Sequence, residues 1–334
     1  MAVDPMEFEE PVAILLKEIQ AMRLMPQTPD RQAAIARLDA RANELRAEIF
    51  THLTPWQRVL VARHADRPVM LDYVGRLFTG FTELHGDRRF GDDKAIVTGM
   101  AHFHGQPVFI IGHQKGSDTK QKIYRNFGYA KPEGYRKALR IMRMAEKFKQ
   151  PIIVFIDTPA AFPGVESEER GVAEAIALNL REMALLDTPI IVVVCGEGGS
   201  GGALGIAIGD RILMQEFAVY SVIPPEGCAA ILWRDPARKI EAAAALKITA
   251  ADLLAMRIID EIVVEPLGGA HHDHAAATAL LDEAMVRHLA QISAMTPSDR
   301  LEARYQKFRS IGRLGHEFTD DAEPTAPQPA RQHR

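Results

Sequence analysis

Cysteine, basic charge and long apolar runs are all scarce in this sequence. Its 334 residues include two cysteines, Cys195 and Cys228, too few for a disulfide framework or a four-cysteine zinc ribbon. A net charge of −4 lacks the basic excess of a nucleic-acid-binding protein. No apolar run approaches the roughly 18 residues that a membrane span needs, and the first residues are acidic where a signal peptide is basic. We expect a cytoplasmic protein with reduced thiols that binds neither nucleic acid nor a membrane.

Residues 1–65 have a pattern typical of helices alone. Apolar residues recur at spacings of three and four in two stretches: Ile14, Leu15, Ile19 and Met22, then Ile35, Leu38, Ala42, Leu45 and Ile49. Thr28 and Pro29 between them are typical of an N-cap and a first helical residue. A capping box from Thr54 to Gln57 indicates a short third helix. The segment predicts a helical hairpin and a linker helix, whose narrow apolar stripes need another surface to pack on.

Residues 66–295 are predicted to form one α/β domain. Two continuous apolar runs, 151–157 and 189–195, flank a helix expected over 167–186. Such runs are typical of parallel strands covered on both faces. Further strands are expected near 95–97, 108–111 and 262–264, and further helices over 133–149, within 236–256 and over 274–293. A C-terminal helix is expected within 296–318, and the Pro-rich polar tail, 319–334, is expected to be disordered.

The most informative segment is a glycine-rich turn, residues 196–205, which follows a buried strand and opens a helix. Gly196, Gly198 and Gly201 match the dinucleotide-binding spacing G-x-G-x-x-G. Against this interpretation, the fingerprint lies far from the start of the domain. The acidic residue that would hold the ribose, Glu216, also follows too soon after Gly201.

The same turn matches a serine nucleophile elbow. Gly198, Ser200 and Gly202 satisfy G-x-S-x-G, and the chain order permits Asp260 and a later histidine as partners. Those histidines are His271, His272 and His274. They stand beside two glycines, and we expect them to form a surface loop that holds neither a triad nor a metal.

A third interpretation is an oxyanion hole without a side-chain nucleophile. Successive glycines let a substrate oxygen approach backbone amides with no Cβ in the way, and the start of a helix adds positive charge. The following short strands and the Pro225-Glu226-Gly227 helix start are similar to the crotonase superfamily. The glycines also permit close packing of the helix on the strand, which is an alternative without any catalytic role.

Several further motifs resemble one family more closely, the carboxyltransferase alpha subunits of bacterial acetyl-CoA carboxylase. The segments that carry the resemblance are 81–88, 92–97, 111–116, 126–128, 132–138, 155–159, 168–171, the glycine-rich turn and 266–271. They occur in order and cover about residues 6 to 315. The resemblance implies an α/β crotonase-like (ClpP/crotonase) spiral fold, here with the N-terminal helical hairpin.

The resemblance also implies an activity and a set of partners. A transferase of this family moves the carboxyl group from carboxybiotin, held on a biotin carboxyl carrier protein, to acetyl-CoA, giving malonyl-CoA for fatty acid biosynthesis. The alpha subunit works with a beta subunit as α2β2, and biotin carboxylase belongs to the larger complex. The zinc ribbon is a feature of beta, so we expect no metal in this chain.

The residues expected to serve this chemistry lie mostly in the glycine-rich turn. The amides of Gly201 and Gly202 are predicted to hold the ureido oxygen of biotin. The predicted substrate-binding residues are Gly198, Gly199, Lys115, Ala160 and Phe162. Lys115 begins a basic stretch that suits CoA phosphates or an acidic carrier surface, although a solvated loop explains it equally well.

One departure from the family pattern falls in residues 158–164. The family usually reads Thr-Pro-Gly-Ala-Tyr-Pro-Gly where this chain has Ala160 and Phe162 at the third and fifth positions. Alanine takes a positive φ less freely than glycine, and phenylalanine lacks the tyrosine hydroxyl. We expect the change to tune the pocket without removing activity. Two competing functions are a lone CoA-thioester hydratase or hydrolase, with Glu197 or Glu226 as its acid or base, and a non-catalytic scaffold.

Overall fold

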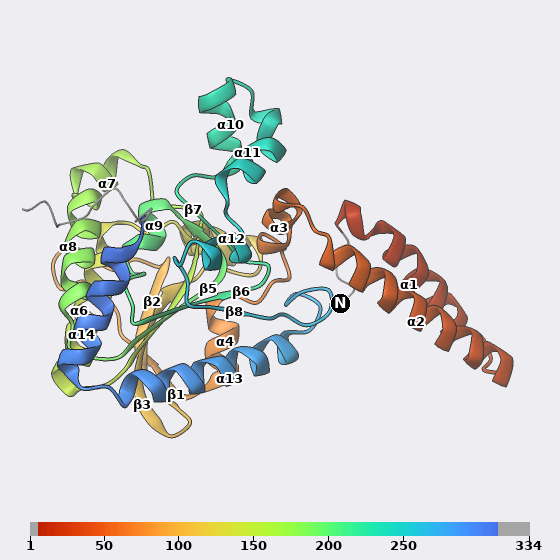
Figure 1. Ribbon diagram of the computed structural model, residues 1–334, viewed down its shortest axis with the longest axis horizontal. Coiled ribbons are helices and arrows are strands. Elements are labelled where there is room, and N and C mark those ends of the chain that lie inside the picture. The colour runs from red at the N-terminus through yellow and green to blue at the C-terminus, as the bar shows by residue number, and fades with distance from the viewer. Residues whose placement is uncertain (1–5, 313–334) are drawn as a thin grey trace, which may run out of the picture.

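A computed structural model describes residues 6–312 of the chain (Figure 1). Its strands are β1 (Phe78–Glu83), β2 (Ile96–Phe103), β3 (Gln106–His113), β4 (Ile152–Thr158), β5 (Ile190–Gly199), β6 (Arg211–Gln215), β7 (Val219–Ser221) and β8 (Glu261–Val263). They form one sheet in the order β1-β2-β3-β4-β5-β6-β8, with β7 paired to β5. The pairs from β3 onward are parallel, and the two pairs before it are antiparallel.

The helices lie at the N-terminus, between the strands and after the sheet. The α-helices are α1 (Glu10–Arg23), α2 (Pro29–Thr51), α3 (Pro55–Ala62), α4 (Met70–Leu77), α5 (Thr119–Tyr124), α6 (Pro132–Phe148), α7 (Val165–Glu169), α8 (Val172–Leu185), α9 (Ser200–Leu204), α10 (Pro225–Trp233), α11 (Lys239–Leu246), α12 (Ala250–Ala255), α13 (His274–Ser293) and α14 (Pro297–Ser310). Short 3₁₀ turns are η1 (Glu7–Glu9), η2 (Asn126–Gly128) and η3 (Pro236–Arg238). No helix within residues 6–312 combines the length and apolarity that crossing a membrane requires.

The N-terminal hairpin is α1 packed against α2, and it projects away from the sheet (Figure 1). Its sequence signals are confirmed, since the N–H of Arg31 donates to Thr28 Oγ1 at 3.3 Å. Thr54 and Gln57 form the expected capping box at the start of α3. The predicted apolar stripes meet in one small cluster between the two helices, except at Ile14, which is 59% exposed, while Val12 is buried in the cluster. The hairpin therefore has its own narrow core, and the main core lies elsewhere.

The centre of the fold is the pair β4 and β5, in which every residue is buried. Helices α6 and α8 contribute to the apolar cluster on one face of the sheet, and α4 and α13 contribute to the cluster on the other. Fully apolar strands are the expected result of this double cover. The carboxyl ends of β4 and β5, where parallel sheets place ligands, carry the loops that contain the glycine-rich turn.

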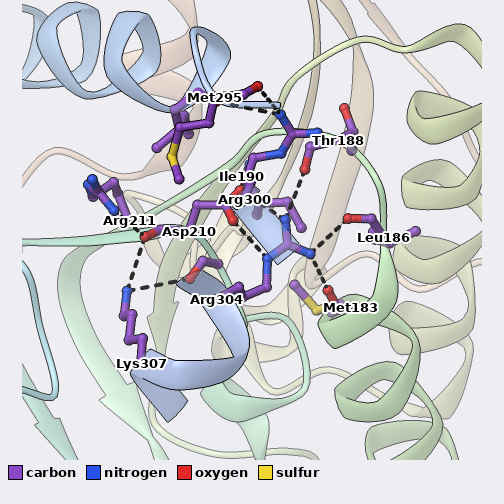
Figure 2. A network of polar contacts seen from close by, with 12 residues as sticks. Met183, Leu186, Thr188, Ile190, Asp210, Arg211, Met295, Arg300, Arg304 and Lys307 are labelled. Atoms are coloured by element: carbon purple, nitrogen blue, oxygen red, sulfur yellow. Dashed lines mark hydrogen bonds and ion pairs between the residues drawn. The ribbon is translucent and has the colours of Figure 1, made fainter. Parts of the chain in front are cut away.

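The C-terminal helix α14 is fixed to the body through a buried arginine (Figure 2). Arg304, only 1% exposed, donates to both carboxylate oxygens of Asp210 at 2.8 and 2.9 Å. Its remaining donors reach the carbonyl oxygens of Met183 and Leu186, each at 2.8 Å, and of Thr188 at 3.0 Å. All five N–H groups of the guanidinium are thereby used. The tail predicted to be disordered, 319–334, lies outside the described residues, as do residues 313–318 of the predicted last helix.

The structure differs from the sequence prediction at a few elements. The single helix expected over 167–186 is two, α7 and α8, because Gly171 has a φ of +74° and ends the first. The elements β1, α4 and α5 were not predicted. The helices expected within 236–256 are present as α11 and α12, and they are separated at Lys247, whose φ is +54°. Both breaks are single left-handed residues, which hydrophobic periodicity does not register.

Candidate active site

The glycine-rich turn joins the end of β5 to the short helix α9. Ser200, the first residue of that helix, has a φ of +49°, so the turn is sharp and strained for a residue with a side chain. A Cβ on Gly199 would stand 1.8 Å from the carbonyl oxygen of Pro159, and one on Gly202 would stand 2.4 Å from the carbonyl carbon of Ala160. Packing of the turn against the loop after β4 therefore requires glycine at 199 and 202.

Gly201 is different, because packing leaves space beside it. A Cβ there would meet only the Cδ1 atom of Ile176, at 3.5 Å, and Gly201 is half-buried. The first amides of a helix lack intrahelical partners, and α9 has no side-chain cap among the described residues. The amides of Ser200, Gly201 and Gly202 thus begin a helix, and a helix start of this kind favours negative charge.

Neither alternative motif has the surroundings that it needs. Gly196 and Gly198 lie inside strand β5, whereas a dinucleotide fingerprint puts its glycines in the turn. Ser200 lines a cavity of about 370 Å³, and none of that cavity's lining residues within the described chain is a histidine. His271 instead stacks on His64, with ring centroids 4.2 Å apart. The dinucleotide and serine-nucleophile interpretations therefore lack support from the geometry.

A network of charged side chains lies beneath the turn. Lys115 Nζ is 2.7 Å from Asp157 Oδ1 and 3.2 Å from Glu197 Oε1. Arg63 bridges two carboxylates: its Nε lies 2.7 Å from Glu197 Oε2, and its Nη1 lies 2.6 Å from Glu226 Oε1. The Asp157 carboxylate also accepts the N–H of Glu197 at 2.9 Å, which ties β4 to β5 immediately before the glycines. The network therefore fixes the backbone from which the turn departs.

The network decides the charge of Glu197. Burial by itself raises the pKa of this carboxyl, but Lys115 and Arg63 outweigh burial and hold the pKa below its ordinary value. Burial likewise lowers the pKa of Lys115, while Asp157 and Glu197 outweigh it and raise that pKa. Both side chains are therefore charged at neutral pH. A carboxylate held ionised in this way is a poor proton donor, which argues against a hydratase that uses Glu197 as its acid.

The loop after β4 brings Ala160 beside the turn and also carries Phe162. The backbone of Ala160 contacts Gly202, and its φ is not positive, so alanine in place of the family's glycine introduces no backbone strain. The amide of Phe162 donates to the carbonyl oxygen of Ala130 at 2.9 Å, and Lys131 Nζ lies 5.0 Å from the centre of the Phe162 ring. Of the predicted residues, the structure thus places Ala160, Gly198, Gly199, Gly201 and Gly202 around one turn, with Lys115 beneath it, whereas the contacts of Phe162 are with Ala130 and Lys131.

Sequence reasoning missed Arg63 and His113. Arg63 follows helix α3 and reaches Glu197 across 134 positions of sequence, so no local pattern marks it. His113 ends strand β3 and is fully buried near the backbone of Gly202 and Phe155. A polar residue two positions after the apolar run 108–111 was the available signal for it.

We expect His113 to make the protein less stable in mild acid. Burial lowers its pKa to about 3, and Lys115 adds to this effect. In the unfolded chain this histidine has a pKa of about 6.5, so below that pH it is protonated there while it stays neutral in the folded protein. The free energy of unfolding therefore decreases as the pH falls towards 3. Between pH 7 and pH 5 this group costs about 2 kcal/mol. Urea unfolding at the two pH values measures the free energy of unfolding, and its decrease from pH 7 to pH 5 should be smaller by this amount in His113→Asn. An unchanged decrease in the variant would show that His113 is not its source.

The fold is of the crotonase-like class, and two solved structures share it. A structure of transcarboxylase 12S with hydrolyzed methylmalonyl-coenzyme A bound matches with a TM-score of 0.56 at 19% identity, over 68% of this chain and 43% of that one. A Pseudomonas malonate decarboxylase hetero-tetramer in complex with coenzyme A matches with a TM-score of 0.54 at 17% identity, over 66% of this chain and 89% of that one. The expected α/β crotonase-like fold is confirmed.

The chain belongs to the acetyl co-enzyme A carboxylase carboxyltransferase-like family, whose model matches residues 5–312. It is 57% identical over 310 residues to the acetyl-coenzyme A carboxylase carboxyl transferase subunit alpha of Geobacter metallireducens. That alignment covers 92% of this chain and 98% of the relative. The family resemblance seen in the sequence motifs is confirmed.

Proposed function

We propose that this chain is the alpha subunit of an acetyl-CoA carboxylase carboxyltransferase, which makes malonyl-CoA in the first committed step of fatty acid biosynthesis. Family membership over residues 5–312 supports the activity. The uncapped start of α9, with open space beside Gly201, is the structural observation that carries the proposal. We place the reaction in the cytoplasm, where the other enzymes of such a pathway would meet its product.

Carboxyl transfer places demands that this turn can meet. In the proposed reaction the carboxyl group would leave the biotin nitrogen as CO2, that nitrogen would take the proton lost by the methyl carbon of acetyl-CoA, and the methyl carbon would then bond to the carbon of CO2. Negative charge develops on the ureido oxygen in one step and on the thioester oxygen in the other. In our assignment the Gly201 and Gly202 amides hold the ureido oxygen, and each such donor is typically worth about 3 kcal/mol.

The other predicted residues support this oxyanion site from around it. Gly198 and Gly199 shape the turn, because a side chain at either would strike Tyr220 or Pro159. Lys115 acts in our proposal through Asp157 and Glu197, whose charges it balances beneath the turn. Ala160 and Phe162 form the side of the site that tunes its shape. No acid or base from Glu197 is invoked, in keeping with its paired and ionised state.

Exposed apolar surface beside the turn favours a partner subunit. The cavity that Ser200 lines is walled mainly by apolar side chains, and Leu204, Val222 and Met256 in its wall are 42%, 72% and 44% exposed. Ile231 and Leu232 on α10 are 70% and 66% exposed. Patches of this kind mark protein interfaces. We propose that a zinc-ribbon beta subunit covers this face in an α2β2 assembly, and that a biotin carboxyl carrier protein and a biotin carboxylase complete the system.

The assay that tests this function is decarboxylation of malonyl-CoA with biocytin as the carboxyl acceptor. It is run on this chain alone and on the chain co-expressed with a zinc-ribbon beta subunit. We expect activity only in the co-expressed sample, because each subunit supplies half of the site. Activity of the chain alone would show that the division of the site is wrong, and inactivity of a correctly assembled α2β2 complex would refute the proposed function.

A further inference from the structure

A cluster of three metal-ligating side chains joins the N-terminal segment to the loop after β8. Glu9 in η1 and His271 and His272 in the loop each offer one donor atom, and these atoms all lie within 4.8 Å of one another. His272 Nε2 is 3.0 Å from Glu9 Oε1. Glu9 and His271 are only 5% and 3% exposed. The sequence prediction of a surface loop is therefore wrong for His271, which points into the protein.

The loop is built to hold both imidazoles in place. Gly268 and Gly269 both have a φ of +89°, and a Cβ on either would press on a histidine ring, His272 in the first case and His271 in the second. The carboxylate of Glu265 accepts the N–H of Ala270 at 2.7 Å and so anchors the residue before His271. The same carboxylate accepts hydrogen bonds from the buried Arg67 at 2.6 and 2.9 Å, which fixes its position.

The observation that points to a ligand is the state of His271. Within residues 6–312, neither of its ring nitrogens has a hydrogen-bonding partner, although both are buried. Its ring is held between aromatic neighbours, stacked on His64 at 4.2 Å and tilted against His272 at 4.4 Å. A buried polar atom without a partner is costly, so native proteins rarely retain one without a reason. A metal bound to one ring nitrogen would remove part of that cost.

We propose that Glu9, His271 and His272 bind one divalent transition-metal ion, with Zn²⁺ the best match. Two imidazoles and one carboxylate form a known zinc donor set, which leaves a fourth position to water. Bonds of about 2.0–2.2 Å require the three donors to draw together by about 1 Å, which η1 and the loop can provide by small side-chain movements. The ion fastens the base of the N-terminal hairpin to the sheet domain. The proposal departs from the sequence expectation of no metal in this chain, and it is independent of the oxyanion site.

The test is zinc binding to the full-length chain after metal has been stripped with a chelator. Titration with ZnCl2 against a chromophoric zinc indicator gives the stoichiometry and affinity, and Co²⁺ reports nitrogen ligation through its absorption spectrum. We expect one ion per chain and slower amide hydrogen exchange in residues 6–52 when zinc is present. An unsaturable or absent response in the wild-type chain would overturn the proposal without any variant.

The matched variant is His272→Arg, which keeps a hydrogen-bond donor opposite Glu9 but cannot ligate a metal. It should melt like the metal-free wild type and bind zinc more than about 100-fold more weakly, a larger loss than removal of an outer-shell partner causes. Glu9→Gln should also lose binding. His102→Ala removes a surface histidine and should leave binding unchanged. Wild-type affinity in both His272→Arg and Glu9→Gln would place the ion elsewhere and overturn the proposal.

Discussion

Replacing Arg304 with methionine is expected to destabilise the protein by about 3–5 kcal/mol, the usual result of removing one partner of a buried ion pair. The substitution leaves the Asp210 carboxylate, 4% exposed, without its cation. It also leaves the carbonyl oxygens of Met183, Leu186 and Thr188 without the donors that they have in Figure 2. Methionine fills much of the same volume, so the loss comes mainly from uncompensated polar groups. Guanidinium unfolding followed by circular dichroism measures it.

Two companion variants separate this cause from a general weakening of α14. Arg309→Ala removes an exposed arginine from the same helix and should change stability by no more than about 0.5 kcal/mol. Adding Asp210→Asn to Arg304→Met removes the unpaired charge and should restore part of the loss. Asn at 210 keeps an oxygen that can still accept the N–H of Ile190, now bound at 2.8 Å. A double variant no more stable than Arg304→Met would show that the unpaired carboxylate is not the source of the effect.

The parts of the fold that were predictable from sequence are those with a strong local signal. Continuous apolar runs marked β4 and β5, and the helix expected over 274–293 is α13. The break between α7 and α8 was missed, because it depends on the single left-handed residue Gly171. Strand β1 was missed because it is an edge strand with only one buried residue. Local patterns report burial and capping, and they do not report which strand pairs at an edge.

The position of the glycine-rich turn could be predicted from the sequence, whereas the charged side chains that pair beneath it could not. A glycine-rich turn after a buried strand has a sequence signature, so the residues around Gly201 were found. The charged network beneath the turn was not, because Lys115, Asp157, Glu197 and Arg63 come from separate elements that only the tertiary fold brings together. The roles of the glycines also needed structure. Sequence alone could not show that Gly199 and Gly202 are required by packing while Gly201 is not.

That distinction makes Gly201→Val the sharpest test of the oxyanion assignment. The new Cβ has room, with Ile176 Cδ1 at 3.5 Å, so the chain should fold and assemble. The side chain would instead occupy the space through which a substrate oxygen approaches the amides of α9. Loss of one oxyanion donor typically lowers kcat by about 10²–10³-fold, and we expect a loss of that size in the α2β2 complex. Gly199→Ala and Gly202→Ala cannot serve the same purpose, because their Cβ atoms would meet backbone atoms at 1.8 and 2.4 Å and disturb the turn itself.

The control for Gly201→Val is Gly75→Val in helix α4, where a Cβ meets no atom within 4 Å and the residue is exposed. It introduces the same side chain at a remote glycine and should leave kcat unchanged. Both variants are compared in the malonyl-CoA assay after size-exclusion chromatography has verified assembly and thermal melting has verified folding. The kcat of Gly201→Ala should lie between those of the wild type and Gly201→Val, because one methyl group obstructs the approach of the substrate oxygen less than an isopropyl group does. If Gly201→Val assembles normally and keeps full activity, the amides at the start of α9 are not the oxyanion donors, and the glycine at 201 has no catalytic role.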